Sequence, residues 1–172
     1  MSKDAAYIQR LYQAAVKATQ GSGILPDTLV TQHILESGMK LSTLAPRANN
    51  FFGIKAGSAW TGPVISAPTT EFIDGKYVRL PGNWQIYPNR AAALADNVNA
   101  SSLFRVYGSE EAGLRGWVEF LKSNPRYTNA GLFTAKTAPE QFAALKRAGY
   151  ATDPQYLTPL TRIYQYAKDF FF

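Results

Sequence analysis

The stretch PDTLVTQHILESG, residues 26–38, predicts an α-helix that carries an unusual acidic residue. Pro26 at the first helical position and Gly38 just past the last one are the usual start and stop signals of a helix. Glu36 lies among apolar neighbours near the C-terminal end, with Gln32 and His33 four and three residues earlier on the same face. The helix therefore presents a carboxylate where a helix end disfavours negative charge.

Helical patterns lie on both sides of this stretch. Residues from about 3 to 19 have apolar side chains at helical spacing, and a last helix is expected from about 155 to 170. Ser109 is expected to cap a further helix, and Thr137 forms a capping box with Glu140. Most of the chain is therefore predicted to be helical.

A small β region interrupts the helices. Glycine and proline become frequent from about 56 to 88, and residues 69–80 predict two short strands around an Asp74-Gly75 turn. Residues 84–94 also resemble residues 104–114, each a strand end that turns into a helix. The order predicts one α+β domain over residues 1–172, with a helical lobe (about 1–55 and 89–172), a β lobe (about 56–88) and a cleft between them.

The amino-acid composition limits the kinds of catalytic and metal sites that the chain can form. The chain has 172 residues, no cysteine, one histidine and a net charge of +6. Thiol nucleophiles and cysteine metal sites are excluded, and a single histidine does not favour a multi-histidine site or a Ser-His-Asp triad, so no metal or other cofactor is expected. No apolar run reaches the ~18 residues of a membrane span, and the first residues lack the apolar core of a secretory signal.

The chemistry is therefore expected to depend on carboxylates. Of the 12 acidic residues, all but Glu36 and Glu71 are explained by first helical turns, turn positions or solvated helix faces. The apolar surroundings and helix end of Glu36 are expected to raise its pKa, as a general acid requires. Glu71 lies on the first predicted strand. An acid at a helix end and an acid on a β lobe are typical of glycosidic bond hydrolysis.

Each of these residues also has a purely structural interpretation. Glu36 is compatible with a surface glutamate at a fraying helix end, and Glu71 with an ordinary solvent-facing strand acid. His33 is interpreted as a helix-face residue rather than a base or a ligand. Position and spacing alone leave these alternatives open.

Motifs along most of the chain resemble the glucosaminidases of glycoside hydrolase family 73, of the flagellar and autolysin type. The motifs occur in the family's order: ILESG at 34–38, NNFFGIKAG at 49–57, TTEF at 69–72, FRVYGS at 104–109, NPRY at 124–127 and LKRAGYATDPQY at 145–156. The resemblance implies a lysozyme-like fold and cleavage of the β-1,4 bond between N-acetylglucosamine and N-acetylmuramic acid in peptidoglycan.

The resemblance also implies roles for individual residues. Glu36 matches the general acid. Glu71 matches the acid of the β lobe. In one mechanism this acid activates water; in the other, the acetamido group of the substrate is the nucleophile. Tyr127 matches the tyrosine that orients this acetamido group. The residues expected to bind substrate are Gln32, Asn50, Phe52, Gly53, Trp60 and Tyr150.

The sequence departs from the family pattern in two places. Met39-Lys40 replaces the usual Trp-Gly after Glu-Ser-Gly, which removes an expected aromatic from the cleft wall. Residues of about 97–114 are either an insertion or, with Phe104 as the family's aromatic, the end of a lengthened hairpin. A muramidase or lytic transglycosylase on the same fold, and a non-catalytic sugar-binding module, are the alternative functions.

Charge and the N-terminal residues suggest partners and location. The net positive charge favours binding to polyanionic peptidoglycan strands, whereas the scattered positions of Lys and Arg do not indicate binding to nucleic acid. Neither membrane insertion nor oligomerisation is expected. Without an export signal, the protein is expected to reach the periplasm or cell wall as a phage lysin or as an effector of a secretion system. An effector implies an immunity protein that occupies the cleft.

Overall fold

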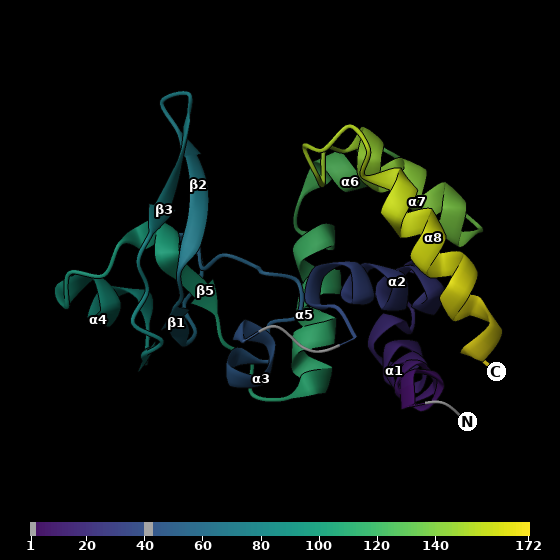
Figure 1. The fold of residues 1–172 in the computed structure, drawn as a ribbon, viewed down its shortest axis with the longest axis horizontal. Helices are drawn as coiled ribbons and strands as arrows, with labels where there is room; N and C mark the ends of the chain where they lie inside the picture. Colours follow the sequence, from purple (N-terminus) through teal and green to yellow (C-terminus); the bar gives the residue numbers. More distant parts are fainter. Residues whose placement is uncertain (1–2, 40–42) are drawn as a thin grey trace. The chain divides into compact units, whose positions relative to one another are not determined.

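The computed structural model describes residues 3–39 and 43–172, and the chain divides into two compact units (Figure 1). Unit 1 comprises Met1–Leu41 and Leu114–Phe172, and unit 2 comprises Ser42–Gly113. Lys40, part of the departure from the family pattern, lies outside the described residues. No helix within the described ranges is long and apolar enough to cross a membrane.

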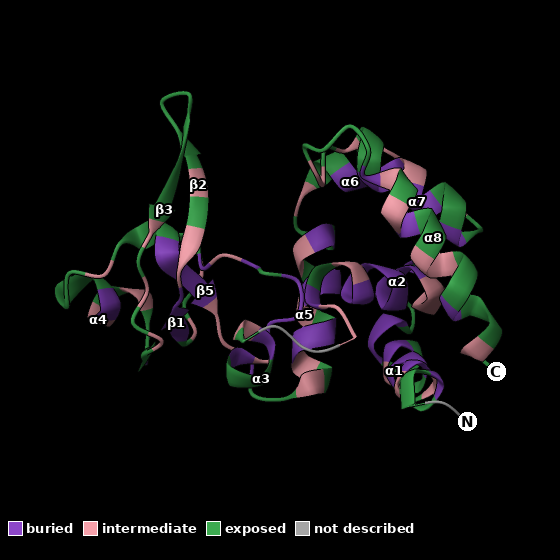
Figure 2. Cartoon of the chain, viewed as in Figure 1, coloured by how far each residue is buried: buried purple, intermediate pink, exposed green. Residues whose placement is uncertain are grey.

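Unit 1 is helical and is organised around α2 (Pro26–Ser37). This helix packs against α1 (Lys3–Thr19), α7 (Ala138–Arg147) and α8 (Leu157–Ala167). The unit also holds α6 (Pro125–Asn129), η2 (Lys168–Phe170) and most of α5 (Glu110–Lys122). Figure 2 shows the resulting burial of α2, whose buried residues include the polar side chains of Gln32 and His33. Because α2 is covered on several sides, it carries apolar residues on more than one face, as its sequence shows.

The end of α2 fixes the position of Glu36. Gly38 adopts the left-handed region with φ of 69°, and its N–H donates to the Ile34 carbonyl at 2.9 Å. Glycine reaches this conformation without the steric cost that a Cβ imposes. The predicted stop signal is therefore confirmed, and the helix that carries Glu36 is closed by a defined cap.

Unit 2 combines short antiparallel strands with short helical segments. A three-stranded antiparallel sheet has the order β4-β1-β5, formed by Ile86–Tyr87, Val64–Ser66 and Leu103–Arg105. The helical segments are α3 (Leu44–Ala48), α4 (Arg90–Ala95) and η1 (Ala100–Ser102). The two similar segments at 84–94 and 104–114 supply the strands on either side of β1. Unit 2 spans Ser42–Gly113 and so includes residues on both sides of the expected lobe of 56–88, among them β5, which pairs with the buried β1.

The predicted hairpin is confirmed, and none of its strand residues is buried. Strands β2 (Thr69–Ile73) and β3 (Lys76–Leu80) pair in antiparallel register, with Glu71 opposite Val78. Asp74 and Gly75 form the turn with φ of 50° and 79°, which matches the two positive φ angles of a type I′ turn. Figure 2 shows both strands largely exposed.

Candidate active site

Glu36 lies at the end of a short hydrogen-bonded chain inside unit 1. The Gln32 amide donates from Nε2 to Glu36 Oε1 at 2.8 Å, and the Tyr156 hydroxyl donates to Gln32 Oε1 at 2.5 Å. Gln32 and Tyr156 are buried, whereas the surface of Glu36 is reached by solvent. Buried Gln32, itself fixed by Tyr156, therefore holds a carboxyl group that solvent reaches.

The protein around Glu36 changes its proton affinity. Desolvation by the surrounding atoms raises the pKa of the Glu36 carboxyl, and the hydrogen bond from Gln32 opposes part of this rise. Burial, together with the charge of Glu36, also raises the pKa of Tyr150 and of Tyr156. Both phenols are therefore neutral at physiological pH. Glu36 is therefore the most acidic side chain of this group.

Aromatic residues extend this group within unit 1. The Tyr150 ring lies 6.1 Å from that of Tyr156 and 6.2 Å from that of Tyr127. Trp117 Nε1 donates to the Tyr150 hydroxyl at 3.0 Å, and Arg126 Nη2 donates to the Tyr127 hydroxyl at 2.8 Å. Burial raises the pKa of Tyr127. The predicted residues Glu36, Gln32, Tyr150 and Tyr127 thus belong to one cluster in unit 1.

Sequence reasoning missed two members of this cluster. Tyr156 ends the motif at 145–156 and was given no role, although it supplies the hydroxyl that fixes Gln32. Trp117 is fully buried and donates to Tyr150, a contact that the sequence pattern does not indicate. The repeated tyrosines of the motif at 145–156 were the available signal. Helical spacing cannot detect Tyr156, because it lies 124 residues from Gln32.

Glu71, the second predicted carboxylate, is held by a cation in unit 2. Lys55 Nζ lies 2.6 Å from Glu71 Oε1, and Thr69 Oγ1 donates to the same oxygen at 2.8 Å. The hydrogen bond from Lys55 lowers the pKa of Glu71 against a smaller opposing effect of burial, and Thr69 lowers it further. Glu71 is therefore ionised at neutral pH and is suited to accept a proton rather than to donate one.

A pocket of about 260 Å³ in unit 2 includes Glu71. Its lining is formed by residues from four segments: Lys55, Ala56, Gly57, Glu71, Arg90, Ala100 and Ser101. The carboxylate therefore faces an open space together with two cationic side chains.

The other predicted substrate-binding residues lie in unit 2 and have structural partners. Asn50 is buried, and its amide bonds the backbone of Ile54 and the Arg105 carbonyl at 2.9 Å. Phe52 is buried, and Gly53 adopts φ of 62° at an exposed position. Trp60 Nε1 donates to the Pro63 carbonyl at 2.9 Å. Substrate contact by these four residues stays a prediction.

His33 is buried in α2. Desolvation and the nearby charge of Arg10 lower the pKa of His33 to about 4, so its ring is neutral at physiological pH. Within residues 3–39 and 43–172, no three His, Asp or Glu side chains gather closely enough to hold a metal ion.

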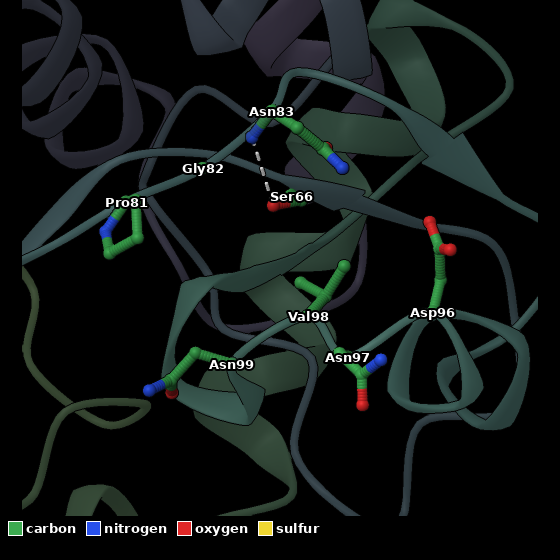
Figure 3. A pocket seen from close by; sticks show the side chains of 8 residues that line it. All are labelled: Ser66, Pro81, Gly82, Asn83, Asp96, Asn97, Val98 and Asn99. Atoms are coloured by element: carbon green, nitrogen blue, oxygen red, sulfur yellow. Dashed lines mark hydrogen bonds between the residues drawn. The ribbon is translucent and has the colours of Figure 1, made fainter.

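A second polar pocket, of about 230 Å³, lies in unit 2 and contains none of the predicted site residues (Figure 3). It is lined by Ser66, Pro81, Gly82, Asn83, Asp96, Asn97, Val98 and Asn99. The Asn83 N–H donates to Ser66 Oγ at 3.3 Å across it. A Cβ at Gly82 would collide with the backbone of Ala67 and Pro68, so the close approach that shapes the pocket requires glycine there.

An α+β fold with one carboxyl of raised pKa and one carboxylate of lowered pKa is typical of a glycoside hydrolase. Residues 12–169 match the model of the glucosaminidase family, described as mannosyl-glycoprotein endo-beta-N-acetylglucosaminidase. The chain therefore belongs to the glucosaminidase family and forms a glycoside hydrolase domain. The resemblance to family 73 is confirmed.

Individual relatives agree with this assignment. Peptidoglycan hydrolase FlgJ of Salmonella typhimurium is 36% identical over 171 residues, which cover 97% of this chain and 46% of that protein. A probable N-acetylmuramidase of Lactococcus lactis is 28% identical over 92% of this chain and 32% of its own length. The chain thus spans about half or less of the length of these relatives.

A solved structure supports the fold directly. The C-terminally truncated glycoside hydrolase domain of FlgJ from Salmonella typhimurium matches with a TM-score of 0.69 at 34% identity, over 97% of this chain and 99% of that one. The predicted α+β, lysozyme-like fold class is therefore confirmed.

Proposed function

We propose that this chain hydrolyses the β-1,4 bond between N-acetylglucosamine and N-acetylmuramic acid in peptidoglycan, with Glu36 as the general acid. Membership of the glucosaminidase family and similarity to a peptidoglycan hydrolase support the substrate class. The observation that carries the proposal is the state of Glu36. Its carboxyl is reached by solvent, has a raised pKa and is held by the buried amide of Gln32.

In the proposed first step, Glu36 gives its proton to the leaving glycosidic oxygen as the bond to the anomeric carbon breaks. The raised pKa increases the fraction of Glu36 that carries a proton at a given pH, as a general acid requires. The carboxylate that results still accepts the Gln32 N–H, so the charge formed by proton transfer has a fixed donor beside it. Tyr156 keeps the amide turned in this direction, because its hydroxyl occupies Gln32 Oε1.

Glu71 is proposed to act as the ionised partner in the same reaction. Its bond to Lys55 holds it in the form that can take a proton from the attacking water or stabilise positive charge at the sugar ring. In the alternative route, the acetamido group of the substrate is the nucleophile and Tyr127 orients it. The loss of activity in Glu71→Gln separates these two routes.

Analysis of the product ends tests the proposed bond specificity. Purified peptidoglycan is digested, reduced with borohydride and examined by mass spectrometry, with Glu36→Gln as the inactive control. Reduced glucosamine ends are expected. Reduced muramic acid ends would identify a muramidase, and anhydro ends a lytic transglycosylase. The muramidase is the second candidate, because one relative carries the name probable N-acetylmuramidase.

Two further assays separate function classes. Dye release from labelled cell walls distinguishes a hydrolase from a sugar-binding module without catalysis, because a binder releases no dye. A salt-dependent mobility shift with DNA tests the nucleic-acid alternative suggested by the net charge of +6.

Delivery and partners also stay predictions. We propose release by phage lysis or injection by a secretion system, action in the periplasm or cell wall, a monomeric state and, for an effector, an immunity protein. The neighbouring genes distinguish the two routes: a holin gene supports the lysin, and an immunity gene supports the effector. Light scattering of the purified chain measures its mass.

A further inference from the structure

The pocket beside Glu71 contains more positive than negative charge. Its lining includes two cations, Lys55 and Arg90, and one anion, Glu71. The remaining lining residues are the small residues Ala56, Gly57, Ala100 and Ser101. A ligand group in this pocket therefore meets charged side chains without a bulky apolar wall.

The charge of Lys55 is already used within the protein. Its ammonium group donates to Glu71 Oε1 at 2.6 Å, to Thr69 Oγ1 at 3.1 Å and to the Ser101 carbonyl at 2.5 Å. An ammonium group has three N–H donors, so none remains for a ligand. Lys55 and Glu71 neutralise each other, and the uncompensated charge of the pocket resides on Arg90.

Arg90 is held in place and still has donors to offer. Arg90 Nη1 donates to the Ala56 carbonyl at 2.9 Å, and its side chain is partly buried. Its other N–H groups have no partner among the described residues. A guanidinium group presents paired donors that fit the two oxygens of a carboxylate, and partial burial reduces screening by salt.

We propose that this pocket binds a carboxylate of the peptidoglycan chain, with Arg90 as the recognition residue. The inference rests on the proposed function, because it places a substrate group next to Glu71. N-acetylglucosamine has no carboxylate. The anionic group therefore belongs to the muramic acid side, either as its lactyl carboxylate or as a carboxylate of the attached stem peptide. Arg90 thus contributes to the choice of a muramic acid neighbour over a neutral sugar.

Steady-state kinetics on four substrates test this inference. The substrates are glycan strands with stem peptides, amidase-treated strands with free lactyl carboxylates, strands whose carboxylates are converted to amides, and neutral N-acetylglucosamine oligomers. Arg90→Gln is compared with the wild type and with Arg79→Gln. Arg79 is an exposed control of the same charge in unit 2; it lies opposite Thr70, on the hairpin face away from Glu71, and does not line the pocket.

We expect Arg90→Gln to raise KM for carboxylated strands roughly 10- to 100-fold with little change in kcat, as loss of a charged hydrogen bond predicts. KM for amidated strands and neutral oligomers should not change, and Arg79→Gln should behave as the wild type. An effect confined to amidase-treated strands identifies the lactyl group, and one confined to peptide-bearing strands identifies the stem peptide. An equal rise in KM on carboxylated and amidated strands, or no rise, overturns the inference.

Two further measurements test the inference if the Arg90→Gln variant does not fold or if the wild type is inactive. If Arg90→Gln does not fold, Arg90→Lys retains the charge without the paired donors, and an intermediate KM for carboxylated strands is expected. An unchanged KM in this variant would overturn the inference. If the wild type cleaves no substrate, the proposed function fails by itself. Calorimetric titration with N-acetylmuramic acid, with an N-acetylmuramyl stem peptide and with the carboxamides of both then decides the inference: preference of the wild type for either acid over its carboxamide supports it, and equal binding within both pairs overturns it.

Discussion

The two units hold their candidate carboxylates in opposite ways. In unit 1, Glu36 is bonded by the neutral amide of Gln32, and the surrounding protein raises the pKa of its carboxyl. In unit 2, Glu71 is bonded by the cation Lys55, which lowers the pKa of its carboxyl. Desolvation is the largest cause of the shift at Glu36, whereas at Glu71 the hydrogen bond from Lys55 outweighs it.

The charge of the bonded partner separates the two carboxylates. A cation within hydrogen-bonding distance favours the ionised form, whereas a neutral donor offsets desolvation only in part. One carboxyl is therefore suited to donate a proton and the other to accept one. Titratable pairs whose environments shift their pKa values apart are typical of acid and base assignments.

The largest expected effect is the decrease in activity when the general acid Glu36 is replaced. Glu36→Gln keeps the shape and the contact with Gln32 but removes the transferable proton, so kcat for wall hydrolysis should fall by about 10²–10⁴-fold or more. Dye release from purified cell walls measures the rate, and circular dichroism checks the fold. A variant that melts normally and hydrolyses walls at nearly the wild-type rate would remove Glu36 from the mechanism.

The second variant tests the catalytic role of the ionised carboxylate of Glu71. Glu71→Gln should reduce kcat about as strongly as Glu36→Gln if Glu71 activates water, and clearly less if the acetamido group is the nucleophile. The same dye-release assay gives the comparison, with Thr70→Val on the opposite face of the same strand as the control. Full activity of Glu71→Gln would exclude a catalytic role for this residue.

The third variant tests the cation that makes the two carboxylates different. Lys55→Met should raise the pKa of Glu71, because it removes the largest cause of the lowered value. If Glu71 acts as a base, activity is lost as pH falls through its pKa, so the acidic limb of the pH–rate profile should move to higher pH. Arg90, the other cation of the pocket, retains its charge, and Lys55→Arg should keep most of the wild-type profile. An unmoved acidic limb would mean that Lys55 does not control the titrating group.

A smaller effect is expected from the buried hydroxyl in unit 1. Tyr156→Phe removes the donor to Gln32 Oε1 and leaves a buried amide oxygen without this partner. Loss of one such bond corresponds to about 1 kcal/mol, so a two- to tenfold decrease in kcat and a lower Tm are expected. Tyr166→Phe, at an exposed position of α8, the helix that follows Tyr156, is the control. Equal activity of both variants would show that Gln32 needs no support from Tyr156.

The smallest expected effect is on stability, and it has opposite signs in the two units. The raised pKa of Glu36 means that the folded state binds this proton more tightly, so the free energy of unfolding decreases as pH rises from the unfolded value of 4.5 to the folded pKa. Glu36→Gln removes this decrease and should leave Tm at pH 7 unchanged or slightly higher.

For Glu71 the lowered pKa stabilises the fold above its unfolded value of 4.5, and this stabilisation is lost as pH falls through the folded pKa. Glu71→Gln should therefore lower Tm slightly at pH 7 and have less effect in acid. Calorimetry at pH 7 and pH 3 measures both variants. The same sign of the Tm change for both at pH 7 would contradict the opposite pKa shifts.

Local patterns were sufficient for several elements of this protein. Pro26 and Gly38 bound α2, Asp74-Gly75 forms the hairpin turn, and Thr137 caps α7 with Glu140 as predicted. The contact between Gln32 and Glu36 followed from helical spacing. These features depend on the conformation of a few neighbouring residues, so a short stretch of sequence determines them.

Only the tertiary structure decided what each carboxylate is bonded to. Tyr156 reaches Gln32 across 124 residues, and Lys55 reaches Glu71 across 16, from a loop to a strand. The pairing of β5 with β1 likewise joins segments that are far apart in the sequence, because Val64 lies opposite Arg105. No periodicity encodes such contacts, because they depend on how separate elements pack. The sequence by itself determined which acids were unusual, and the packing around them determined the direction in which each pKa moved.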